Sequence, residues 1–98
     1  MKLVLKDKTE LTISSMNDNY NSNAVSDTDK RSIAFTIDKP EENITIDYLS
    51  GLLTEDNLSA AQVVSETATK AIEPCKITNI SENITDDYHS LTIRACYK

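Results

Sequence analysis

The sequence predicts a small α+β fold, built mainly from an antiparallel β-sheet with one short helix near residues 45–53. Apolar and polar side chains alternate near both ends of the chain, as they do in strands that bury one face. Residues 45–53 instead place apolar side chains at i, i+1, i+4 and i+5, which is typical of one helical face. With 98 residues, the chain is expected to be a single domain, 1–98, with one core.

Residues 2–14 are expected to form a β-hairpin. Its alternating apolar residues are Leu3, Leu5, Leu11 and Ile13. Folding the chain about Lys8 puts these four side chains on one face, with Leu5 opposite Leu11. A turn of this kind favours a positive φ at Lys8, a conformation that costs a non-glycine residue on the order of 1 kcal/mol.

Residues 15–31 form a polar segment that we expect to be a mobile surface loop. The segment has asparagine at every second position from 17 to 23 and few apolar side chains that could pack. The alternation is superficially similar to a calcium loop. Such a loop needs a glycine at its sixth position and carboxylates at its odd positions, and this segment has neither.

A strand and then a helix are expected next. Residues 32–38 alternate and predict the strand, with the apolar face Ile33, Phe35 and Ile37. The helix near 45–53 has Thr45 as its expected N-cap and Asp47 in its first turn, where the helix dipole favours a carboxylate. The helix should therefore be short and held by packing.

Residues 58–72 allow either a helix or a strand. Thr54, followed by two acids, is a good helix start, and a thin apolar stripe could continue the helix. The β-branched pair Val63 and Val64 and the threonine-rich residues 65–69 favour a strand that follows a turn.

Residues 75–97 are expected to form a second β-hairpin, joined through an acidic turn. None of the registers that match the apolar faces places Cys75 opposite Cys96, as a disulfide requires. Only a less favourable register would bring them together. We therefore expect two free thiols, with Cys75 in the core and Cys96 half-exposed.

The negative charge is confined to the middle of the chain. The net charge is −6, yet residues 1–37 and 67–98 are each neutral, so residues 38–66 hold the whole excess. The acids that we expect to contact a basic partner protein are Asp38, Glu41, Glu42, Asp47, Glu55 and Asp56. The alternative is a solvated polar surface without a partner.

The composition excludes several classes of function. The acidic balance disfavours direct binding to a nucleic-acid backbone, which needs a surplus of lysine and arginine. One histidine, His89, and two widely spaced cysteines do not form a zinc module, and the single glycine, Gly51, excludes a glycine-rich phosphate loop. We therefore expect no catalytic residues, no cofactor and no metal.

No stretch approaches the roughly 18 apolar residues of a membrane-spanning helix. The apolar run between Lys2 and Lys6 is also too short for the core of a signal peptide. We therefore expect no membrane partner and a cytoplasmic location.

Three segments resemble small proteins encoded among the structural genes of phages and prophages of Gram-positive bacteria. They are MKLVLKDKTELTIS at 1–14, ITIDYLSGLLTEDNLSAAQVV at 44–64, and the terminal alternating strand after an acidic turn. The resemblance covers most of the chain apart from 15–31 and includes no catalytic motif. Such proteins have glycine in the hairpin turn, where this chain has Lys8. The resemblance implies an accessory or tail-associated role, in the host cytoplasm or in the virion.

Two functions of different classes follow as hypotheses. The first is a non-enzymatic, phage-type protein-binding module that acts through an edge strand or the side of its helix. The alternative is an acidic, anti-CRISPR-like inhibitor, whose residues 38–66 imitate phosphate charge in the basic channel of a host defence nuclease. Binding that falls steeply with salt would favour the inhibitor.

Overall fold

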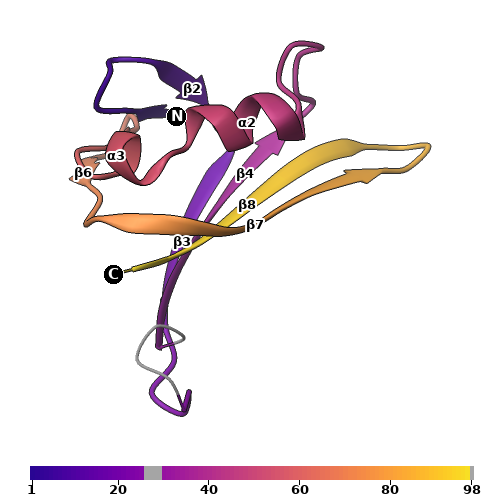
Figure 1. Cartoon of the computed structure of the whole chain (residues 1–98). Coiled ribbons are helices and arrows are strands. Elements are labelled where there is room, and N and C mark those ends of the chain that lie inside the picture. The colour runs from indigo at the N-terminus through magenta and orange to yellow at the C-terminus, as the bar shows by residue number, and fades with distance from the viewer. Residues whose placement is uncertain (26–29, 98) are drawn as a thin grey trace.

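The computed structural model describes residues 1–25 and 30–97 and contains, in that part of the chain, two antiparallel sheets of four strands each and two short helices (Figure 1). This confirms a small α+β fold, although the fold is rich in strand. The expectation of one sheet is wrong. The strands divide between two sheets because the chain crosses from one sheet to the other three times, and the apolar faces of both sheets contribute to one common core.

The two sheets are defined by their strands. Sheet A has the order β2-β1-β5-β6 and comprises β1 (Lys2–Val4), β2 (Glu10–Thr12), β5 (Gln62–Val64) and β6 (Thr69–Ala71). Sheet B has the order β3-β4-β8-β7 and comprises β3 (Ser15–Tyr20), β4 (Arg31–Asp38), β7 (Cys75–Ile84) and β8 (His89–Tyr97). The chain crosses between the sheets from β2 to β3, from β4 to β5 and from β6 to β7. The first and last of these crossings join edge strands of the two sheets.

The predicted hairpin at 2–14 is present, but its register differs from the prediction. Leu3, not Leu5, lies opposite Leu11. The shift is an even number of residues, so the alternation is kept and all four predicted apolar side chains are buried. The turn uses the residues between the strands: the Leu5 amide donates to the Thr9 carbonyl at 2.9 Å, and Lys8 has φ 76°.

The expected loop at 15–31 is wrong over residues 15–20, which form β3. This strand pairs with β4 along its full length. Its polar composition hid it, because one face is solvent-exposed and the other carries Met16 and Asp18 in place of a run of aliphatic side chains. Met16 packs against the core. Residues 26–29 of the expected loop lie outside the described residues.

The predicted helix is confirmed as α2 (Ile46–Leu52), with the Thr45 hydroxyl accepting from the Tyr48 amide at 3.1 Å. A single helical turn follows as α3 (Glu55–Leu58), capped by Thr54. The segment left open, 58–72, therefore follows this helical turn, which ends at Leu58, and contains strands β5 and β6, in agreement with the favoured strand interpretation. Of these two strands, only β5 was anticipated, as the favoured strand around its valines.

The inner face of sheet B forms the floor of the core. In each central strand every second side chain is buried there, and Phe35 of β4 lies opposite Ile93 of β8. Sheet A and the helices supply the opposing side chains. They include Leu3, Leu5, Leu11, Val63, Leu49, Leu53 and Leu58. Both helices pack against β7, while the β7–β8 hairpin extends away from them (Figure 1).

The predicted C-terminal hairpin is confirmed as β7 and β8, with a register shift between Ile77 and Asn79. Cys75 lies opposite Tyr97, and Cys96 lies opposite the next residue along β7, so the two sulfurs belong to opposite faces of the sheet. Both cysteines are free, Cys75 buried and Cys96 half-buried. Burial raises the pKa of the Cys75 thiol to about 11.

Lys8→Gly is expected to raise the free energy of unfolding by about 0.5 to 1 kcal/mol. Glycine adopts the positive φ without the steric cost that Lys8 carries, and this gain exceeds the extra freedom of glycine in the unfolded chain. Urea denaturation measures the difference. Lys8→Ala is the matched control, because it removes the side chain but keeps the restriction on φ. Equal stability of the two variants would contradict the prediction.

Candidate functional site

Two of the acids predicted to bind a partner meet in one hollow. Asp38, at the end of β4, and Glu41, in the loop before α2, line a hollow of about 320 Å³ together with Glu10 of β2. We call it the acidic hollow. The remaining lining is mainly apolar and includes Pro40, Ile44 and Tyr48, with Lys39 as its only lysine. The predicted acids Glu42 and Asp47 are exposed and do not line it.

The corner that shapes the acidic hollow is fixed by backbone hydrogen bonds. The Asp38 amide donates to the Ser14 hydroxyl at 2.8 Å, and the Lys39 amide donates to the His89 carbonyl at 2.8 Å. Lys39 itself has φ 51°, so the chain turns sharply where β4 ends. The carboxylate of Asp38 therefore stands on a corner that two neighbouring segments hold in place.

The other two predicted acids lie elsewhere. Glu55 and Asp56 begin α3, and Asp56 Oδ1 accepts from Lys6 Nζ at 3.0 Å. Beside this ion pair, the Asn57 side chain bonds the carboxylate of Asp7 at 3.1 Å. These contacts tie α3 to the β1–β2 turn, so this end of the acidic segment is engaged with its own protein.

A charged cluster that the sequence did not predict joins the two sheets. Asp18 Oδ2 accepts from Lys70 Nζ at 3.1 Å and from Tyr97 Oη at 3.0 Å, and lies 3.4 Å from Arg31 Nη2. Arg31 also bonds Glu73 at 3.0 Å and lies 4.2 Å from the Tyr97 ring centroid. This Asp18 cluster links three strands of sheet B to β6 of sheet A.

The cluster shifts the pKa values of its members. Burial opposes ionisation of Asp18, but hydrogen bonds from Lys70 and Tyr97 and the charges of Lys70 and Arg31 outweigh it and hold the pKa of this carboxyl below its usual value. Burial first, and then the hydrogen bond to Asp18, raise the pKa of Tyr97 to about 12. At neutral pH the phenol is therefore a donor and the carboxylate an acceptor, a pairing suited to holding the sheets together.

The one histidine and the half-buried cysteine do not meet. Both lie on β8, but seven residues apart and on opposite faces, since His89 pairs with Ile84 and Cys96 with Lys76. His89 Nε2 lies 2.7 Å from Glu82 Oε2 on the same hairpin. The arrangement gives Cys96 no adjacent base for nucleophilic chemistry.

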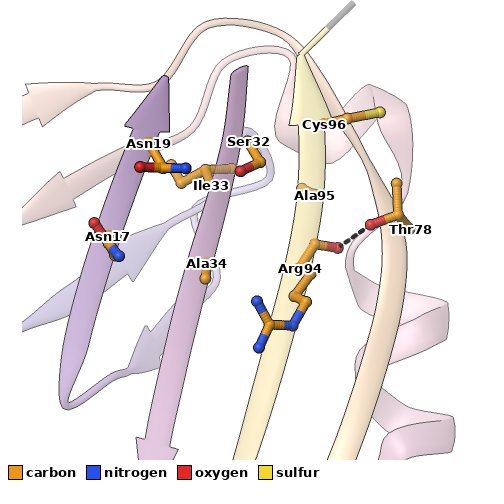
Figure 2. Close-up of a pocket in the computed structure, with 9 residues that line it drawn as sticks. All are labelled: Asn17, Asn19, Ser32, Ile33, Ala34, Thr78, Arg94, Ala95 and Cys96. Atoms are coloured by element: carbon orange, nitrogen blue, oxygen red, sulfur yellow. Dashed lines mark hydrogen bonds between the residues drawn. The ribbon is translucent and has the colours of Figure 1, made fainter. Parts of the chain in front are cut away.

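A second hollow, of about 380 Å³, lies on the face of sheet B that turns away from the core. We call it the outer-face hollow. Figure 2 shows its floor over Ala34 of β4, with the amides of Asn17 and Asn19 on one side and the Arg94 side chain reaching from β8 on the other. Cys96 lies beside it on β8.

Sequence reasoning missed the outer-face hollow. The alternation of β8 already predicts that Arg94 and Cys96 lie opposite the apolar face. The missing element was β3, whose Asn17 and Asn19 were assigned to a loop. The alternation of asparagines from 17 to 23 was the available signal, because it begins with the period of a strand.

Comparisons of the chain with family models, with curated proteins and with solved structures gave no match. In residues 1–25 and 30–97, no helix is long and apolar enough to cross a membrane. The same part of the chain contains no group of three or more His, Cys, Asp or Glu side chains that could hold a metal ion.

Asp18→Asn is expected to lower the free energy of unfolding by roughly 1.5 to 3 kcal/mol, since the charged acceptor of two hydrogen bonds is lost. Because the folded pKa of Asp18 is lowered, its contribution is complete above the ordinary pKa of 3.8 and disappears as the pH falls through the folded value. Denaturation at pH 7 and pH 3 measures both effects. Asp86→Asn, at an exposed turn, is the control and should change stability by less than about 0.5 kcal/mol.

Tyr97→Phe should remove the phenol whose pKa is raised to about 12. A folded pKa of about 12, above the ordinary 10.0, means that the Tyr97 hydroxyl stabilises the fold below pH 10 and that this contribution is lost as the pH rises toward 12. Phenolate absorbance of the native protein during an alkaline titration measures it. If the wild type and Tyr97→Phe gave the same absorbance change near pH 12, the hydrogen bond from Tyr97 to Asp18 would be contradicted.

Proposed function

We propose that this protein is a non-enzymatic protein-binding module of phage or prophage type, and that the acidic hollow binds a basic segment of its partner. The observation that carries the proposal is the presence of three carboxylates, of Glu10, Asp38 and Glu41, in one hollow at the free edge of a sheet. The charge selects a basic partner, and the strand edge and the apolar lining supply the remaining contacts.

The strand edge comes from the position of β2. It is the first strand in the order of sheet A, so one side of it pairs with β1, and the described residues place no strand on its other side. An extended peptide can add to such an edge through main-chain hydrogen bonds. Its alternate side chains would then point toward the hollow, where the lining decides which residues are accepted.

The lining suits lysine or arginine. Asp38 and Glu41 make no ion pair with other described residues, and Glu10 pairs only with Lys2, at 3.5 Å, where both side chains are half-exposed. Such exposed pairs contribute little and can be exchanged for a partner's cation. Tyr48 and the other apolar lining residues can cover the aliphatic stem of the bound side chain, and the tyrosine ring can also attract its cation.

The setting of this function rests on the sequence resemblance. Residues 1–14 and 44–64 resemble small proteins of phage structural-gene regions, and both segments belong to the part of the fold that forms the acidic hollow and its surroundings. An accessory or tail-associated protein works by binding other proteins, in the host cytoplasm or in the virion. We propose that the acidic hollow is the surface through which this protein binds its partner.

The inhibitor hypothesis has less support in the geometry. A protein that imitates nucleic acid needs free charges along its surface, and Asp56 is already bound to Lys6. The acids are also divided between the acidic hollow and the start of α3. Binding to a basic channel would depend on the whole field of the protein, whereas binding in the hollow depends on particular carboxylates.

The test is binding of a fluorescein-labelled peptide of alternating lysine and valine, measured by anisotropy. Asp38→Asn with Glu41→Gln is expected to weaken binding at least about fivefold, because both carboxylates line the hollow. The matched control is Glu42→Gln with Asp47→Asn, which removes the same charge nearby and should change binding less than about twofold.

Three outcomes would overturn the proposal. Equal weakening by the two double variants would show that the general negative field, as in the inhibitor hypothesis, governs binding. Failure of the wild type to bind the peptide would contradict the proposal that the acidic hollow binds a basic segment. Turnover of any substrate that is lost on His89→Ala would show an enzyme instead. Weaker binding in Asp38→Asn with Glu41→Gln alone would support binding in the acidic hollow.

A further inference from the structure

The outer-face hollow contains an arginine that no carboxylate of the described chain neutralises. The sequence has two arginines, and they differ in their surroundings. Arg31 bonds both Asp18 and Glu73, whereas the Arg94 guanidinium has no hydrogen bond or ion pair with any described residue. The main chain of Arg94 belongs to the sheet, and its oxygen also accepts a hydrogen bond from the Thr78 hydroxyl at 3.2 Å. In a chain with an excess of acids, an unpaired arginine in a hollow is a distinctive feature.

The hollow is shaped by the size of its side chains. Ser32 and Ala34 are small and form its floor, and the longer side chains of Asn17, Asn19 and Arg94 rise around it (Figure 2). These strands belong to a continuous sheet, so the floor is rigid and the spacing of the side chains is set by the strand pairing.

The polar groups around the hollow have unused hydrogen-bonding capacity. No bond from the side-chain amides of Asn17 and Asn19 to another described residue is present, and each amide can both donate and accept. The guanidinium adds a planar fork of donors that matches a carboxylate in bidentate geometry. A peptide carrying a carboxylate would satisfy both kinds of group, since its main chain can bond the asparagines.

The outward positions of sheet B carry positive charge near the hollow, whereas the net charge of the chain is −6. Lys76 of β7 lies on the same face, opposite Cys96, and is exposed. The only acid at an outward position of the four strands, among the described residues, is Asp38 at the far end of β4, four residues from Ala34 and therefore about 13 Å along the strand. An acidic group approaching the hollow thus meets cations first.

We propose that the outer-face hollow is a second docking site, which takes an acidic segment of a partner protein with one carboxylate bound by Arg94. This goes beyond the proposed function, which concerns a basic segment on another surface. A protein segment fits better than nucleic acid, because two cations on a chain of net charge −6 cannot offset repulsion of a phosphate backbone. The module would then hold two partner segments of opposite charge.

The test uses a fluorescein-labelled octapeptide of alternating glutamate and threonine at physiological salt, with binding followed by anisotropy. Arg94→Gln is expected to weaken binding at least about tenfold, and Arg94→Lys should fall between this variant and the wild type, because it keeps the charge but loses the fork. Lys8→Gln removes one positive charge from the exposed turn of sheet A and should leave binding unchanged.

Cys96 provides an independent readout of where the peptide binds. It is half-buried beside the hollow, whereas Cys75 is buried, so iodoacetamide should alkylate only Cys96 in the folded protein. Saturating peptide is expected to slow this reaction severalfold. Because Arg94 is exposed and its side chain makes no hydrogen bond or ion pair with a described residue, its variants should fold, which circular dichroism checks before binding is measured.

The proposal is overturned by any of four results: no saturable binding up to about 1 mM peptide, unchanged binding in Arg94→Gln, no protection of Cys96, or equal competition by a single-stranded oligonucleotide of the same charge. The last result would indicate recognition of charge in general. The alternating lysine and valine peptide should bind Arg94→Gln as tightly as it binds the wild type. This control allows the proposal for the outer-face hollow and the proposal for the acidic hollow to fail independently.

Discussion

The strict alternation of side chains in β4 and β8 is the constraint on which the rest of the structure depends. Phe35 and Ile93 lie opposite each other at the centre of sheet B, and burying each contributes roughly 1.5 to 3 kcal/mol. Because every second side chain points inward, the apolar face must be covered, and sheet A with the two helices covers it. The same alternation turns Ala34 and Arg94 outward, so the core lies on one face of these strands and the outer-face hollow on the other.

The Asp18 cluster completes the attachment of the two sheets where the apolar layer ends. Tyr97 is the last buried residue of β8, and its hydroxyl bonds Asp18 on the edge strand β3 while Lys70 reaches the same carboxylate from sheet A. A partly buried carboxylate with three polar neighbours is well satisfied, so it adds specificity to the pairing of the sheets as well as stability. We therefore interpret the Asp18 cluster as a structural contact between the two sheets.

The two hollows differ in the way they would recognise a partner. The acidic hollow is bordered by a strand edge and a loop corner, so it can combine main-chain pairing with charge. The outer-face hollow lies across the face of sheet B, so recognition there would come from side chains, above all Arg94 and the asparagine amides. Two sites of opposite charge would suit a protein that bridges others, as the proposed function and the proposed second docking site together imply.

The sequence by itself determined the elements whose side chains follow a local period. The hairpin face from Leu3 to Ile13, the helix capped by Thr45 and the inward face of β8 all follow from spacing, because a side chain's direction repeats with the backbone geometry of its own segment. The separation of the two cysteines onto opposite faces followed for the same reason. The location of the negative charge in residues 38–66 was also readable directly from the chain.

Only the tertiary structure decided which segments meet. β3 is a strand because it pairs with β4, not because its own composition favours a strand. It supplies Asp18 to the Asp18 cluster and two asparagines to the outer-face hollow. The fold also separates the acids of 38–66. Asp56 forms an ion pair with Lys6, whereas Asp38 lines the acidic hollow together with Glu10. Such contacts join residues far apart in the chain, and their energies depend on distances that no local pattern encodes.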